Sequence, residues 1–254
     1  VKDLMEKLEV FYLSNKSENI YFTLLGDCTQ SSKENENIDK EIIQEGLKQV
    51  KFLNKKYCKE NNQIFNFLYR NRIWNDKENS YLGWERKRGA IHEFNEYMLG
   101  NSKNTFRVNT INKIPKIKYI ITLDADTDLV LNTAFELIGA MAHVLNTPVI
   151  DKERKIVVDG YGLIQPRIGV NLNISHKNLF TELFAGAGGI DSYTNAISDI
   201  YQDNFEEGIF TGKAIYDLEV FSEVLSDAFP ENTVLSHDLL EGNYLRCGLA
   251  TDIL

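Results

Sequence analysis

An apolar segment that runs directly into a row of carboxylates constrains this chain more than any other feature. Residues 118–131 read KYIITLDADTDLVL, in which an apolar, β-branched run is followed by Asp124, Asp126 and Asp128. The run has the length and composition of a buried strand. In α/β proteins, ligands bind where such strands end. The three anions repel one another, and a divalent cation shared with substrate phosphates removes that cost. The segment therefore predicts a strand that ends in a cation or phosphate site.

Strand-like and helix-like segments alternate along the 254 residues. Predicted strands cover 20–25, 64–69, 119–123, 155–158 and 163–168, and polar loops cover 31–41, 71–83 and 100–116. Predicted helices cover 1–13, 42–58, 86–99, 132–144, 177–184, 192–203, 220–228 and 238–246. This alternation predicts an α/β fold with a mostly parallel sheet that is flanked by helices and joined by right-handed crossovers. We expect a single domain over residues 1–254.

Bulk properties exclude several classes of protein. A net charge of −9 argues against a nucleic-acid binder, which usually carries a basic face. Cys28, Cys58 and Cys247 form no CxxC pair, so we expect neither a disulfide framework nor a structural zinc site. No apolar run approaches 18 residues, and no signal peptide is present, so we expect no membrane span in this chain. Because the first residue is valine, we expect a piece of a longer protein.

Several chemistries share the carboxylate pattern that follows residue 123. A calcium loop needs glycine and glutamate at the positions held here by Leu129 and Phe135. A haloacid-dehalogenase phosphatase uses D-x-D-x-[TV], which residues 126–130 match, but that motif normally opens the chain. The carboxylates could instead belong to a solvated turn at the start of a helix, where the helix dipole favours negative charge. This interpretation fits Asp128 well and Asp124 poorly. A nucleotide-sugar transferase of the GT-A type places D-x-D after a central strand, and both the location and the context fit that interpretation.

Three further segments have a chemical and a structural interpretation. Residues 84–90, WERKRGA, place basic groups and a glycine at a helix start, which suits an anion, although an ordinary solvated helix start reads alike. The glycines of residues 208–217, GIFTGKAIYD, let a ligand approach the backbone, or they form a β-turn. Asp238 is either a general base or, with Glu241 three residues later, the N-cap of a helix. Residues 185–189, AGAGG, lack the spacing of a dinucleotide loop.

Seven ordered motifs resemble one family over nearly the whole chain. LLGDCTQ, GWERKRGAIHEFN, YIITLDADTDL, GYGLIQPRIGV, LFAGAGGIDSYTNAISDIYQD, GIFTGKAIYD and FPENTVLSHDLLEGNYLRCGLATDI are similar to the glycosyltransferase domain of cyclic β-1,2-glucan synthases. The resemblance implies a GT-A fold related to the cellulose-synthase-like group, and UDP-glucose as donor. It also implies Mg²⁺ or Mn²⁺ as cofactor, a glucan or protein acceptor, and inversion at the anomeric carbon. The parent would be membrane-anchored, with this domain on the cytoplasmic side of the bacterial inner membrane.

The resemblance also implies roles for individual residues. Residues 1–130 would form a nucleotide-binding half and residues 131–254 an acceptor-binding half. The donor side would consist of Asp27 at the base or ribose, the Lys87, Arg88 and Gly89 motif near uracil or phosphate, and Asp124 with Asp126 as the D-x-D, Asp126 being the more direct metal ligand. The acceptor side would consist of Phe210, Thr211, Gly212, Lys213 and His237, with Asp238 as catalytic base.

Two departures from the family pattern keep other functions open. The family normally begins with a strand that contacts the donor, and we expect this chain to start after that strand. No Q-x-x-R-W-type motif lies between Asp238 and Leu254. The alternatives are a catalytically silent domain that binds nucleotide or carbohydrate within a larger polypeptide, and a phosphatase acting on phosphosugars.

Overall fold

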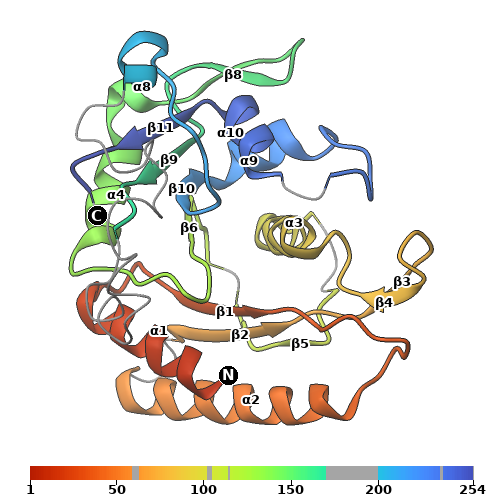
Figure 1. The fold of residues 1–254 in the computed structure, drawn as a ribbon. Helices are drawn as coiled ribbons and strands as arrows, with labels where there is room; N and C mark the ends of the chain where they lie inside the picture. Colours follow the sequence, from red (N-terminus) through yellow and green to blue (C-terminus); the bar gives the residue numbers. More distant parts are fainter. Residues whose placement is uncertain (59–62, 102–104, 114, 170–199, 235–236, 254) are drawn as a thin grey trace, which may run out of the picture. The chain divides into compact units, whose positions relative to one another are not determined.

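The computed structural model describes the chain except for residues 59–62, 102–104, 114, 170–199, 235–236 and 254 (Figure 1). The chain divides into two compact units, which are described separately. Unit 1 comprises Val1–Ile117 and Phe229–Leu235, and unit 2 comprises Lys118–Ala228 and Ser236–Leu254. The helix predicted over 177–184, the AGAGG segment and the first part of the helix predicted over 192–203 lie outside the described residues. The nucleotide-binding half over 1–130 and the acceptor-binding half over 131–254 remain predictions, because a division into compact units does not show what each part of the chain binds.

Unit 1 is built on a three-stranded sheet with the order β1–β2–β5. Its strands are β1 (Phe22–Gly26), β2 (Phe65–Tyr69) and β5 (Val108–Asn109). β1 and β2 are parallel, with Gly26 opposite Tyr69, and β5 is antiparallel to β2. Every residue of β2 is buried, as expected for the central strand of a covered sheet. Helices α1 (Lys2–Ser14) and α2 (Asn37–Tyr57) lie along one side of this sheet in Figure 1, and α3 (Arg86–Leu99) lies on the other side.

Local sequence signals explain where the helices of unit 1 begin and end. α3 has the predicted bounds, and Gly100 follows it with a left-handed φ of 76°, as a helix C-terminus favours. α2 begins five residues before the predicted start at residue 42, because Glu36 and Asp39 form a reciprocal capping box. The predicted loop over 71–83 contains a hairpin of β3 (Ile73–Asn75) and β4 (Ser80–Leu82), whose strands are too short to show a period.

Unit 2 contains a four-stranded sheet with the order β11–β9–β10–β6. Its strands are β6 (Tyr119–Thr122), β9 (Leu163–Pro166), β10 (Ala214–Asp217) and β11 (Cys247–Ala250). Successive side chains of a strand point to opposite faces. Ile215 therefore packs in the cluster with Leu137 and Met141, whereas the ring of Tyr216 lies 4.3 Å from that of Phe221.

The helices of unit 2 cover both faces of this sheet. Helix α4 (Thr133–Ala142), which carries Leu137 and Met141, packs on one face. Helices α9 (Leu218–Leu225) and α10 (Asp238–Leu245) lie on the other face (Figure 1). The 3₁₀-helix η1 (Val144–Asn146) follows α4, and a hairpin of β7 (Val149–Asp151) and β8 (Ile156–Asp159) follows η1. Helix α8 (Ile200–Phe205) contacts β11 through Gln202. The Gln202 side chain donates a hydrogen bond to Leu249 O at 2.8 Å and accepts one from Leu249 N at 2.5 Å.

The predicted α/β class is confirmed, but the prediction of one mostly parallel sheet is wrong for the described strands. The strands form several small sheets, and β10 is antiparallel to both β6 and β9. The sequence reading missed β10 and β11, because the first follows a glycine-containing loop and the second follows directly after a helix. Thr211 forms a hydrogen bond with Gln165 near the end of β9, and Lys213 forms an ion pair with Asp124 beyond β6. The chain therefore enters β10 from the edge at which its neighbours end, and β10 runs back between them.

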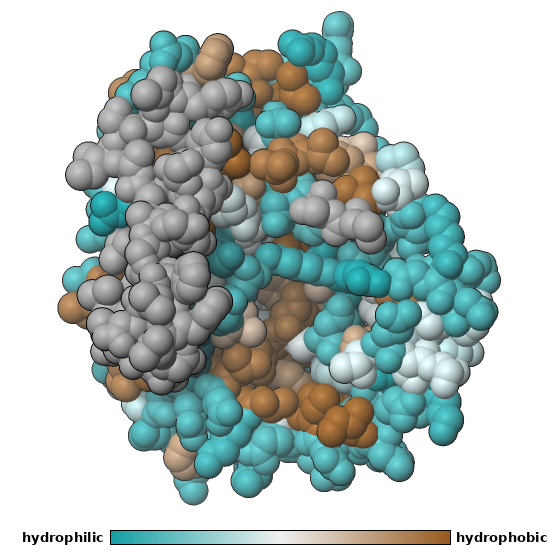
Figure 2. Space-filling model, in the orientation of Figure 1, coloured by the Kyte–Doolittle hydropathy of each residue, from teal (hydrophilic) through white to brown (hydrophobic). Residues whose placement is uncertain are grey.

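On the face drawn in Figure 2, hydrophilic residues predominate and apolar patches lie between them. None of the described helices combines the length and the apolar character needed to cross a membrane.

Candidate active site

Asp124 and Lys213 meet at one edge of the sheet in unit 2. β6 and β10 are antiparallel, with Thr122 opposite Ala214, so the end of β6 and the start of β10 lie side by side. Asp124 is two residues beyond that end and Lys213 is one residue before that start. Lys213 Nζ lies 2.8 Å from Asp124 Oδ2, and the side chains are 20% and 32% exposed. This pair therefore combines a carboxylate with an ammonium group, and both remain partly accessible to solvent.

Residues 208–213 form a loop that is held in place by contacts with Gln165 and with helix α10. Thr211 donates from its backbone N to Gln165 Oε1 at 2.6 Å, and its hydroxyl lies 3.0 Å from the same oxygen. Phe210 is buried, and a Cβ added at Gly242 of α10 would lie 2.7 Å from its Cβ. Gly212 has φ of +90°, a conformation that favours glycine. The structure thus brings the predicted acceptor-side loop next to Asp124 and packs it against α10.

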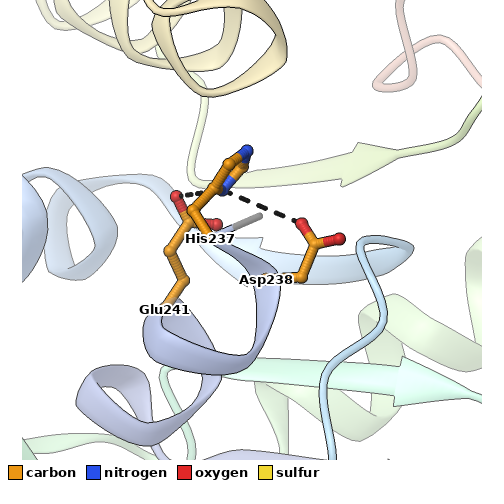
Figure 3. A group of neighbouring side chains, drawn as sticks. All are labelled: His237, Asp238 and Glu241. Atoms are coloured by element: carbon orange, nitrogen blue, oxygen red, sulfur yellow. Dashed lines mark ion pairs between the residues drawn. The ribbon is translucent and has the colours of Figure 1, made fainter. Parts of the chain in front are cut away.

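Helix α10 starts with a compact group of ionisable side chains (Figure 3). His237 is the N-cap residue and Asp238 the first helical residue, so the alternative that Asp238 is the N-cap is wrong. His237 Nδ1 lies 2.9 Å from Glu241 Oε1 and 3.8 Å from Asp238 Oδ1. His237 and Glu241 are buried, whereas the Asp238 side chain is 27% exposed. Asp238 is therefore the most solvent-accessible side chain of the three.

Two sets of side chains in unit 2 offer ligands for a cation. Asp124 and Asp126 provide the carboxylate oxygens that Mg²⁺ and Mn²⁺ prefer, and Asp126 is exposed in the turn closed by a 3.0 Å bond from Thr127 N to Asp124 O. This donor set fits the cation that the D-x-D pattern implies. The second set is His237, Asp238 and Glu241, whose ligand atoms all lie within 4.8 Å of one another. Among the described residues, the three aspartates after β6 do not form such a group.

Asp27 lies at the corresponding edge of the sheet in unit 1, where β1 and β2 end together. Arg70, directly after β2, is fully buried, and its Nη1 lies 2.9 Å from Asp27 Oδ2. Its Nε also lies 2.8 Å from Glu93 Oε2. Burial, aided by the negative charge of Asp27, raises the pKa of the Cys28 thiol to about 11, so this cysteine is no thiolate nucleophile at neutral pH. Asp27 is thus held by an arginine, and its side chain remains 34% exposed.

The WERKRG segment forms a tight turn into α3. Glu85 and Arg86 both have φ of 51°, and a Cβ on Gly89 would lie 1.8 Å from the carbonyl oxygen of Trp84. Arg88 pairs with Glu85 at 2.8 Å, and its guanidinium lies 5.8 Å from the centre of the Trp84 ring. Among the predicted donor-side residues, Arg88 therefore forms an ion pair within the turn, and residue 89 has to be glycine because the turn leaves no room for a Cβ. Lys87 is half-buried at the start of the helix.

The segment Phe229–Leu235 belongs to unit 1, although unit 2 precedes and follows it in the sequence. The ring of Phe229 lies 5.9 Å from the Arg88 guanidinium, and Asn232 N donates to Glu85. Asn232 also accepts a hydrogen bond of 2.8 Å from Asn75 at the end of β3. The WERKRG turn is thus braced by the residues that lead to His237 and Asp238 in the sequence.

Sequence reasoning missed two residues in these clusters. Arg70 was hidden because a lone arginine after a strand carries no motif, although its place opposite Asp27 follows once β1 and β2 are paired. Glu241 was considered only as part of a helix-start pattern. Its position four residues after His237 was the available signal, because such residues share one face of a helix.

The chain was also compared with known proteins. No family model matches it. It is 39% identical to "Cyclic beta-(1,2)-glucan synthase NdvB" of Rhizobium meliloti (strain 1021) over 255 aligned residues, which cover 100% of this chain and 9% of that protein. The chain therefore spans about a tenth of the length of this curated relative. The similarity extends over every predicted site residue, and the chain is related along its whole length to a segment of a cyclic β-(1,2)-glucan synthase.

Proposed function

We propose that this chain is a metal-dependent, inverting glucosyltransferase domain of the GT-A type that uses UDP-glucose to build β-1,2-glucan. The observation that carries the proposal is the meeting of Lys213 and Asp124 at the sheet edge, in a chain similar throughout to a glucan synthase segment. An ammonium beside a D-x-D carboxylate suits a diphosphate, which needs both a lysine and a cation to balance its charge. As part of a longer protein, the domain would be membrane-anchored and would face the cytoplasm.

The proposed reaction assigns each group one task. Asp124 and Asp126 would hold Mg²⁺ or Mn²⁺, and the bound ion would supply Lewis-acid stabilisation of the leaving diphosphate. Lys213 donates to a phosphate oxygen. Asp238 accepts the proton of an acceptor hydroxyl whose oxygen bonds to the anomeric carbon, while the bond from that carbon to the diphosphate oxygen breaks on the opposite face.

The remaining predicted residues complete the two substrate sites. The resemblance assigns contacts with the nucleotide to Asp27, Lys87, Arg88 and Gly89. Phe210, Thr211, Gly212 and His237 line the acceptor side.

Calorimetric titration of UDP into the chain, with and without Mn²⁺, tests the nucleotide site. We expect binding that requires Mn²⁺, is lost in Asp126→Asn and is weakened in Lys213→Met. The matched control is Asp227→Asn, which changes an aspartate of unit 2 whose side chain is 81% exposed. Because Asp126 is also exposed, its substitution leaves the packing intact. UDP binding that is equally strong in Asp126→Asn would refute the metal assignment.

Transfer of glucose from UDP-glucose to a β-1,2-glucan primer tests the chemistry. We expect Asp238→Asn to lose about 10²–10⁴-fold in rate, the usual contribution of a general base, while UDP binding is retained. Normal turnover by this variant would show that another group accepts the proton. Binding of UDP without any transfer by the wild-type chain would instead indicate the silent binding domain, for which the small share of the relative that this chain spans is the favouring observation.

A further inference from the structure

The group of His237, Asp238 and Glu241 has a geometry that the proposed reaction does not explain. His237 Nδ1 is buried and lies 2.9 Å from Glu241 Oε1, yet it makes no hydrogen bond to any described residue. The approach of the two atoms therefore lacks the alignment of an N–H aimed at an oxygen. Figure 3 shows both carboxylates turned toward the same ring nitrogen. Atoms that lie this close without bonding each other have lone pairs available for a common third partner.

The spacing of these atoms suits a small metal ion. A four-coordinate ion with bonds of about 2.0–2.1 Å holds its ligands roughly 3.3 Å apart. The distances from His237 Nδ1 to Glu241 Oε1 and Asp238 Oδ1, 2.9 and 3.8 Å, lie on either side of that value. All three ligand atoms lie within 4.8 Å of one another. Small side-chain adjustments therefore bring them to one ion.

The charge of the group also calls for a cation. Glu241 is only 4% exposed, and a buried carboxylate is costly unless it is paired. Its ion-pair partner among the described residues is His237, an imidazole that also faces the Asp238 carboxylate. Two carboxylates beside one imidazole leave a net negative charge even when the imidazole is protonated. A divalent cation balances that charge.

We propose that His237, Asp238 and Glu241 bind a borderline divalent cation such as Zn²⁺. One imidazole nitrogen and two carboxylate oxygens make a three-ligand set with an open fourth position, which zinc accepts and which differs from the oxygen ligands of Asp124 and Asp126. If Asp238 is the base, as the proposed function holds, the bound ion occupies its lone pair and inhibits transfer.

Titration of the whole chain with Co²⁺, without nucleotide, tests this site. Four-coordinate Co²⁺ absorbs visible light strongly, and we expect one equivalent to give such a spectrum, to be displaced by Zn²⁺ and to resist excess Mg²⁺. Glu241→Gln and Asp238→Asn should weaken Co²⁺ binding by at least the roughly 10–100-fold that even outer-shell changes cause. The matched control is Glu223→Gln, on the exposed side of α9, which should leave the spectrum unchanged.

The outcomes are separable from those of the nucleotide experiments. Absence of the visible spectrum, or a spectrum that both ligand variants retain, overturns the cation site. If Glu241→Gln fails to fold, Asp238→Asn decides, because the Asp238 side chain is partly exposed at the start of α10. Failure of UDP binding leaves the Co²⁺ result standing, since the titration contains no nucleotide.

Discussion

Replacing Gly242 with alanine tests the contact through which α10 supports the 208–213 loop. A Cβ at this position would lie 2.7 Å from Phe210 Cβ and 3.5 Å from Phe210 N. The first distance is shorter than real Cβ contacts, and the atom it meets adjoins the backbone of the loop. No rotamer change relieves such a clash, so either the helix or the loop has to move. Gly139 is the matched control, because it lies in α4 of the same unit and a Cβ there would meet nothing within 4 Å.

The two substitutions share one favourable effect and differ in one unfavourable effect. In both helices, alanine improves on glycine by about 0.8–1.0 kcal/mol through helix propensity. Overpacking at Gly242 opposes this with about 1–3 kcal/mol, whereas nothing opposes it at Gly139. We therefore expect Gly139→Ala to raise the free energy of unfolding of unit 2 by about 1 kcal/mol. Gly242→Ala should lie about 1–3 kcal/mol below Gly139→Ala.

Urea unfolding followed by far-UV circular dichroism measures this difference. Because both variants change the same unit, their transition midpoints are compared within one cooperative transition, provided that the slope m is unchanged. Displacement of the loop also moves Lys213, so UDP should bind more weakly to Gly242→Ala than to Gly139→Ala. If Gly242→Ala is stabilised as much as Gly139→Ala, α10 does not pack against Phe210, and the argument that links the loop to the helix fails.

The other predictions concern buried charges and thiols. Burial favours protonated Asp39, but hydrogen bonds from Arg72 and Tyr69 outweigh it and lower the pKa of this carboxyl from 3.8 to about 2. The free energy of unfolding of unit 1 should therefore fall by about 2 kcal/mol as the pH is lowered from about 4 to about 2, as measured by urea unfolding across that range. Asp39→Asn should abolish this dependence and, by leaving Arg72 unpaired, destabilise unit 1 by about 3–5 kcal/mol at pH 7; an unchanged acid limb would contradict the assignment. Arg70→Met should cost a similar amount, because two carboxylates lose their buried partner, and thermal unfolding checks this. Iodoacetamide labelling at pH 8 should modify the half-buried Cys58 well before Cys28, whose pKa is raised to about 11; equal rates would refute that shift.

Some of these features follow from local sequence, and others require knowledge of strand pairing. α3 was predictable in full because its polar start, its helical spacing and Gly100 all agree. The strand before Asp124 was predictable for the same kind of reason, since its apolar run is bounded by charges. Arg70 was not, because its role arises from the parallel pairing of β1 with β2, which places residue 70 beside residue 27. β5 and the β3–β4 hairpin were hidden because strands of two or three residues carry no period that distinguishes them from loops.

The antiparallel direction of β10 is the departure with the greatest consequence for the site. In a parallel sheet, a residue that precedes one strand lies at the opposite edge from a residue that follows its neighbour. For strands of four residues at about 3.3 Å per residue, that separation is roughly 13 Å or more, beyond the reach of any ion pair. Because β10 runs against β6, Lys213 precedes its strand at the edge where Asp124 follows its own, and their charged atoms meet at 2.8 Å. The mixed sheet thus places the Lys213 cation beside the Asp124 anion, 89 residues apart in the sequence, where the proposed diphosphate would need both.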